Sequence, residues 1–117
     1  MLVIKKGLDF QDFEELFSYE LNYFPYEASR IIYDYLVEQG EELEEENISD
    51  FIRYDINVMS VDEVIGDYES MMDEDELDRA KEDDALTEYV ESFLNDYTMI
   101  LGTYEEEGET FFVFTEF

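Results

Sequence analysis

Negative charge is the feature that most constrains how this chain can fold. The 117 residues include 35 Asp and Glu against 6 Lys and Arg, with no His, so the formal net charge at pH 7 is −29. Ionised carboxylates are almost never buried without a partner, so nearly all of these side chains must lie on the surface. Hydrophobic residues nevertheless make up 45% of the chain, which is too apolar for a disordered acidic tail. The sequence therefore predicts a folded protein with an acidic surface.

The length of the chain suits one domain with one modest core, so we expect residues 1–117 to form a single domain. The sequence contains neither Cys nor His. Thiolate or imidazole zinc sites and Ser-His or Cys-His catalysis are therefore excluded. No apolar stretch approaches the about 18 to 20 residues of a membrane span, and the first residues lack the charge order of a signal peptide, so we expect a cytoplasmic protein.

Hydrophobic periodicity predicts several amphipathic helices. Asp9 is suited to cap a first helix that ends near Phe17, and Pro25 is suited to the start of a second helix that Gly40 closes. Ser60 and Glu63 form a capping-box pattern before a third helix that should end near Met72. The clearest apolar stripe spans residues 86–97, and Leu77 and Ala80 predict one further helical turn.

Alternating or β-rich runs predict a small sheet. Apolar residues alternate with polar ones between Ile52 and Val58, which favours a half-buried strand. Residues 98–104 and 109–115 predict a hairpin in which Gly108 supplies the positive-φ position, and residues 2–4 could form another strand. The expected fold class is α+β, with a small antiparallel sheet of the central strand and the C-terminal hairpin packed with three to four helices.

Two acidic runs, residues 41–46 and 73–84, are too long to be explained by helix capping. We expect at least one of them to contact a partner. The candidate partner-binding residues are Glu41, Glu42, Glu44, Glu45, Glu46, Asp73, Glu74, Asp75, Glu76, Asp78, Glu82, Asp83 and Asp84.

Other roles for these carboxylates are weaker interpretations. A catalytic pair needs an environment that shifts one pKa, whereas acids in runs and on outward helix faces are solvated. A calcium loop that starts at Asp73 would place Leu77 and Asp78 where an oxygen ligand and a glycine are needed. We therefore expect no catalytic residues, no cofactor and no metal site.

Aromatic residues offer a second candidate contact surface. Tyr19, Tyr23, Phe24 and Tyr26 gather around Pro25 and are not easily all buried together. Tyrosines of this kind often anchor protein interfaces.

The charge itself points to a function. The net charge of −29 equals that of the phosphates in about 50 Å of duplex DNA, whereas a compact chain of this length is only about 35 Å across. In size and charge the chain resembles the DNA-mimic inhibitors that bacteriophages and mobile elements deploy against host defence, namely antirestriction proteins of the Ocr and ArdA kind and several anti-CRISPR proteins. Segments such as 26–28, 33–36 and 65–68 and the closing hairpin also look like small acidic phage proteins.

The resemblance implies a non-enzymatic inhibitor in the bacterial host cytosol. Its partner would be a basic nucleic-acid-binding protein, a CRISPR effector nuclease ahead of a restriction enzyme. An acidic surface repels nucleic acid and anionic lipid alike, so we expect neither to bind directly. The alternative is an acidic regulatory module that binds a basic protein without competing for DNA. The oligomeric state stays open.

Overall fold

The computed structural model describes residues 9–39 and 45–117, and the fold is α+β, as expected. The chain divides into two compact units. The first ends at Ile56 and includes Glu116, and the second contains residues 57–115 and Phe117. The folding of the whole chain as one domain stays a prediction. The expected strand at residues 2–4 and the helix end at Gly40 lie outside the described residues.

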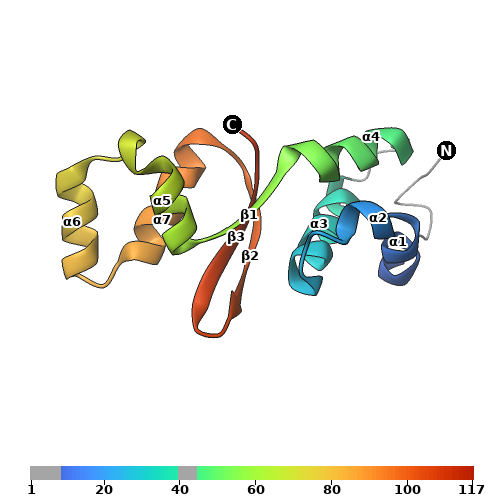
Figure 1. Ribbon diagram of the computed structural model, residues 1–117, viewed down its shortest axis with the longest axis horizontal. Coiled ribbons are helices and arrows are strands. Elements are labelled where there is room, and N and C mark those ends of the chain that lie inside the picture. Colours follow the sequence, from blue (N-terminus) through green and yellow to red (C-terminus); the bar gives the residue numbers. More distant parts are fainter. Residues whose placement is uncertain (1–8, 40–44) are drawn as a thin grey trace. The chain divides into compact units, whose positions relative to one another are not determined.

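The first unit is helical (Figure 1). It contains α1 (Phe10–Leu16), α2 (Ser18–Leu21), α3 (Tyr26–Gln39), α4 (Glu45–Asp50) and a π-helical turn, η1 (Phe51–Asp55). The predicted cap is confirmed, because the Asp9 carboxylate accepts the backbone N–H of Asp12 at 2.8 Å. Buried apolar side chains from all five elements form the core of this unit: Phe13, Phe17, Leu21, Ala28, Ile32, Leu36, Ile48 and Ile52.

The strand predicted from Ile52 to Val58 is wrong in its first half. Residues up to Asp55 continue α4 as the turn η1, and the strand β1 covers only Ile56–Ser60. Ile48, Ile52 and Ile56 are buried four residues apart, whereas Tyr54 is 64% exposed. A buried face with a spacing of four residues is typical of a helix, so the helical spacing outweighed the period-two pattern.

The second unit holds the sheet and three α-helices. The strands β1, β2 (Ile100–Glu106) and β3 (Glu109–Thr115) are arranged in the order β1-β3-β2. The predicted hairpin is confirmed: β2 and β3 pair antiparallel, and the turn places Glu107 at φ 53° and Gly108 at φ 83°. The helices are α5 (Val61–Tyr68), followed by the 3₁₀ turn η2 (Glu69–Met71), then α6 (Glu74–Glu82) and α7 (Leu86–Tyr97).

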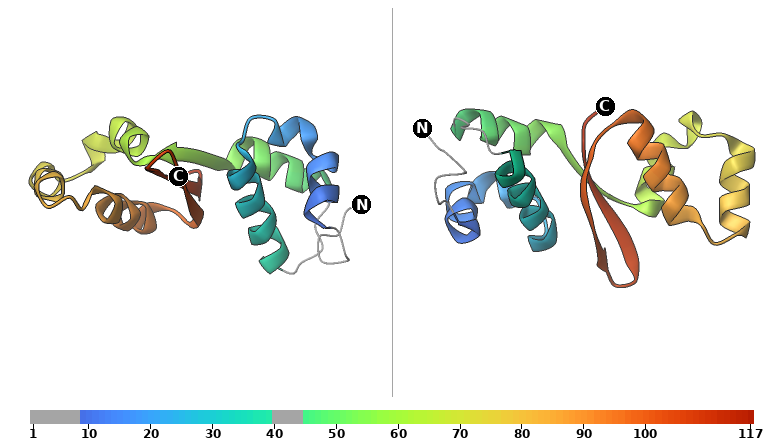
Figure 2. Two further views of the ribbon diagram at one scale, coloured as in Figure 1. Left: turned by 90° about the horizontal axis from the view of Figure 1, so that it is seen from below. Right: turned by 180° about the vertical axis from the view of Figure 1, so that it is seen from behind.

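The core of the second unit lies between the sheet and two of its helices. Phe112 and Phe114 of β3 pack with Val64 of α5 and with Val90 and Leu94 of α7, all completely buried. In every view α6 lies on the side of α5 and α7 that faces away from the sheet (Figures 1 and 2). The described residues form seven α-helical segments, more than the three to four expected. The excess consists of short helices, since several of the seven have fewer than ten residues. Within the described ranges, no helix is long and apolar enough to cross a membrane.

Candidate functional site

The two acidic runs belong to different units. Glu41, Glu42 and Glu44 lie outside the described residues, and Glu45 and Glu46 begin α4 in the first unit. The run from Asp73 to Asp84 lies in the second unit, where it forms the whole of α6 and both of its ends. All residues of the second run are described, so this run is the candidate site.

The charges in the first turn of the acidic run 73–84 and its two bases suit the helix dipole, whereas Glu82, Asp83 and Asp84 at its C-terminal end oppose it. The Asp73 carboxylate caps α6 by accepting the backbone N–H of Glu76 at 3.0 Å. Three carboxylates occupy the first turn, and Arg79 and Lys81 lie in the last turn. Acids near the N-terminus and bases near the C-terminus both stabilise a helix. The result is a helix of nine residues rather than the single turn that the sequence predicted.

Two side chains of α6 are buried against the rest of the unit. Leu77 and Ala80 are buried where α6 packs on α7. All eight carboxylates of the run are exposed, namely Asp73, Glu74, Asp75, Glu76, Asp78, Glu82, Asp83 and Asp84. A helix of nine residues is about 13 Å long, and the same length of duplex DNA carries about eight phosphate charges. Five of the eight carboxylates lie within these nine residues and the other three flank them, so the helix itself carries fewer carboxylates than such a duplex carries phosphates.

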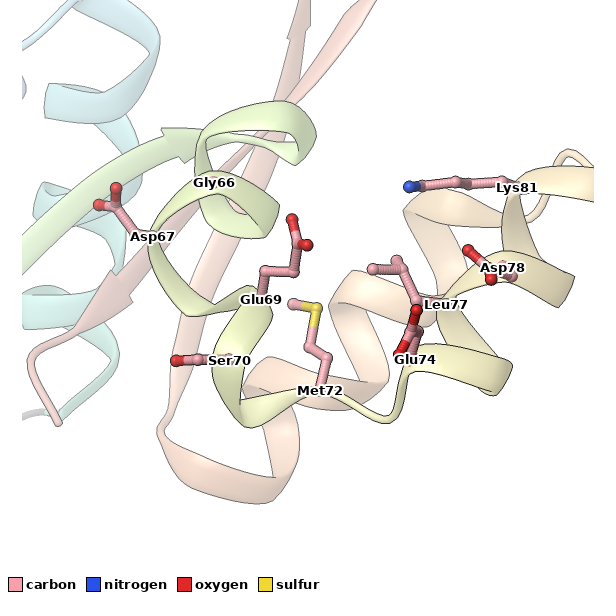
Figure 3. A pocket seen from close by; sticks show the side chains of 9 residues that line it. All are labelled: Gly66, Asp67, Glu69, Ser70, Met72, Glu74, Leu77, Asp78 and Lys81. Atoms are coloured by element: carbon pink, nitrogen blue, oxygen red, sulfur yellow. The ribbon is translucent and has the colours of Figure 1, made fainter.

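An open pocket of about 610 Å³ separates α6 from the α5–η2 segment. Figure 3 shows Glu69 and Met72 extending from the α5–η2 side, and Leu77 and Lys81 from α6, into the same space. Asp67 and Ser70 point away from it in this view. Lys81 supplies a positive charge to this pocket, so the carboxylates around it are partly compensated.

A smaller pocket of about 260 Å³ lies where α6 begins, between the end of η2 and α7. Three carboxylates line it, those of Asp73, Glu76 and Asp96. Its other walls include Tyr89 and Tyr97. The pKa of Tyr89 is raised above its usual range, first because the phenol is buried and next because the Glu76 carboxylate repels a phenolate.

The carboxylates are spread out rather than clustered. In the part of the chain that the structure describes, no group of three or more Asp or Glu side chains is placed to hold a metal ion.

The aromatic cluster around Pro25 is partly exposed. Tyr19, Tyr23 and Tyr26 are each more than half exposed, whereas Phe24 is half-buried. The guanidinium of Arg53 lies 5.5 Å from the ring centre of Tyr19 and 5.9 Å from that of Tyr54. Arg53 and Tyr54 belong to η1, where the sequence pattern predicts a strand, so the pattern gives no sign of this contact.

Sequence reasoning also missed the pockets on both sides of α6. Asp96 and Tyr97 are more than ten residues from the acidic run, and only the packing of α6 on α7 brings them to it. The one signal in the sequence was Gly66, a glycine inside a predicted helix, which lines the larger pocket.

Comparison of the chain with protein-family models, curated proteins and solved structures gave no significant match.

Proposed function

We propose that this protein is a phage-type inhibitor of a host defence enzyme and that it acts as a DNA mimic in the basic nucleic-acid-binding cleft of that enzyme. The observation that carries the proposal is the run from Asp73 to Asp84, whose eight carboxylates are all exposed on a folded helical frame. An RNA-guided effector nuclease is the preferred target, and a restriction enzyme is the second.

The magnitude of the charge supports this proposal over a role in solubility. A net charge of about 2 to 8 keeps a small domain soluble, whereas this chain carries −29. The excess charge destabilises the folded state through self-repulsion. A surface of this kind complements a positively charged channel, where charge complementarity speeds association and selects the partner.

The second candidate is an acidic regulatory module that binds a basic protein without displacing DNA. The exposed tyrosines of the first unit favour it, because Tyr19, Tyr23 and Tyr26 could anchor a contact that needs no nucleic-acid cleft. A competition experiment with DNA distinguishes the two functions, because a mimic and DNA cannot occupy the cleft of the target at the same time.

The decisive experiment is a displacement assay on purified RNA-guided nucleases and restriction enzymes. We expect the protein to release fluorescent duplex DNA from its target and to bind poorly to target that is already loaded with DNA. Binding should also weaken as salt rises, because exposed charges are screened. Equally tight binding to free and DNA-loaded target would contradict mimicry and favour the regulatory module.

Charge-reversal variants locate the contact. The triple change Asp78→Lys, Glu82→Lys and Asp83→Lys places one cation in the middle of α6 and two at its C-terminal end, where they suit the helix dipole. The matched control is Glu105→Lys, Glu106→Lys and Glu109→Lys in the exposed part of the hairpin. Both variants change the net charge equally. We expect the α6 variant to bind the target more weakly than the hairpin variant, and equal loss would show that only the total charge matters.

A further inference from the structure

The pocket between the beginning of α6 and α7 differs from its neighbours in its charge balance. Among the described residues, three carboxylates and no Lys or Arg line it. Lys81 lines the larger pocket beside α5, and Arg79 lines a third pocket, which shares Glu76 and Tyr89 with the smaller one. Among the three described pockets that residues of α6 line, the smaller one is therefore acidic without an internal counter-charge. A pocket beside the hairpin turn, lined by Asp62, Asp84 and Glu109, has the same charge balance but no aromatic residue in its walls.

The walls of this pocket combine charge with polarisable apolar surface. Met71 and Met72 contribute thioethers, and Phe93 and Tyr97 contribute aromatic rings whose centres are 4.9 Å apart. Aromatic faces attract cations, and Arg does so more often than Lys. Apolar walls suit the methylene stem of a long side chain, while the carboxylates suit its charged head.

The volume of the pocket and the spacing of its carboxylates indicate which kind of cation it could bind. The described carboxylates are not placed to bind a metal ion as a group of three. A planar guanidinium can stack on an aromatic ring and donate two parallel hydrogen bonds to a carboxylate. The volume of about 260 Å³ is of the order needed for one long side chain.

We propose that this pocket is a binding site for the guanidinium of a single arginine side chain. The source of that arginine rests on the proposed function: it would be presented by the basic cleft of the target. The exposed outer face of α6 then supplies long-range attraction, and the pocket supplies one specific contact. Burial is the first cause of the raised pKa of Tyr89, and the second is repulsion by the Glu76 carboxylate, which places a negative charge beside this wall of the pocket.

A direct test uses small probes and needs no target protein. Isotope-labelled full-length protein is titrated with N-acetyl-arginine N-methylamide, and the signals of Tyr89, Tyr97 and the methyl groups of Met71 and Met72 are followed by NMR. The capped citrulline analogue has nearly the same shape without the charge, and the capped lysine analogue has the charge without the planar fork. We expect the arginine probe to shift these signals at lower concentration than either analogue.

A pair of charge-matched variants shows whether binding occurs in the pocket. The double change Glu76→Gln and Asp96→Asn removes two carboxylates that line it, whereas Asp75→Asn and Glu91→Gln removes two exposed carboxylates from the same helices that do not. Both variants have the same net charge, and all four changes preserve side-chain shape. We expect the pocket variant to weaken arginine binding by about fivefold to tenfold, because charge-assisted hydrogen bonds are lost, and the control by less than about twofold.

Three results would overturn the assignment: equal weakening in both variants, equal binding of citrulline or lysine, or no shift of the pocket signals. None of these results would contradict the DNA-mimic proposal, which the displacement assay tests separately. Conversely, arginine binding by a protein that displaces no DNA would contradict mimicry and leave the pocket assigned.

Discussion

At the scale of single residues, alanine substitutions at Gly66 and Gly108 should have opposite effects on stability. A Cβ added at either position would meet no atom within 4 Å, but Gly66 lies inside α5 whereas Gly108 has φ +83°. We expect Gly66→Ala to raise the free energy of unfolding by about 0.5 to 1 kcal/mol, because alanine reduces the entropy of the unfolded chain. Gly108→Ala should lower it by about 1 kcal/mol, because the left-handed region is unfavourable for alanine. Urea denaturation of both variants checks this, and a change of the same sign in both would contradict it.

Tyr89 makes a prediction for alkaline pH. Burial and then the repulsion from Glu76 raise the pKa of its phenol in the folded state. Below the usual tyrosine pKa of about 10 the phenol is protonated in both states, so its full contribution to stability is present. As pH rises past that value, the unfolded state ionises first and stability is lost until the folded pKa is passed.

The Tyr89→Phe variant should therefore lose less stability than the parent protein between pH 9 and about pH 11. Tyr23→Phe is the control, because Tyr23 is 74% exposed. Urea denaturation across this pH range gives the two slopes. Identical slopes for the parent and Tyr89→Phe would show that the phenol does not couple to folding.

At the scale of elements, α6 depends on its cap more than on the charge of the capping residue. Asp73 accepts the N–H of Glu76, and asparagine can do the same, whereas alanine cannot. We expect Asp73→Ala to destabilise α6 by about 1 kcal/mol and Asp73→Asn to destabilise it much less. Amide hydrogen exchange of residues 74–82 measures this directly. If amide exchange in α6 were faster than in the parent protein by the same factor in both variants, the charge of Asp73 and not its hydrogen bond would stabilise the helix.

At the scale of the whole molecule, like charges oppose folding. With 35 acidic and 6 basic residues, repulsion exceeds attraction on average, although local pairs such as Arg30 with Asp34 exist. The screening length falls from about 30 Å at 0.01 M salt to about 8 Å at 0.15 M. We expect the thermal midpoint to rise over this range of sodium chloride. A neutral osmolyte at matched osmolality is the control, and a falling midpoint would mean that specific ion pairs dominate.

The two compact units should unfold together. The units comprise 57 and 60 residues, a size at which a domain buries only about 60% of its unfolded surface and is marginally stable alone. We expect one transition when NMR signals of Ile32 and Val90, one from the core of each unit, are followed with urea. Separate midpoints for the two signals would contradict the single domain expected from chain length.

The sequence by itself determined the features that depend on neighbouring residues. Ser60 and Glu63 form the predicted capping box, with hydrogen bonds of 3.2 and 2.9 Å, and Gly108 supplies the predicted left-handed turn. These interactions join residues within a few positions of each other, so their geometry is encoded in the local pattern. The total charge is likewise a sum over residues and does not depend on the fold.

Only the tertiary structure decided the rest, because burial depends on residues far apart in the chain. Ile52 fits both a strand and a helix by spacing, and its burial together with that of Ile48 and Ile56, four residues away on either side, accompanies the turn η1 in place of the predicted strand. The acidic pocket likewise combines Glu76 of α6 with Asp96 of α7. No local pattern joins these two carboxylates, and only the burial of Leu77 and Ala80 where α6 packs on α7 brings them to one cavity.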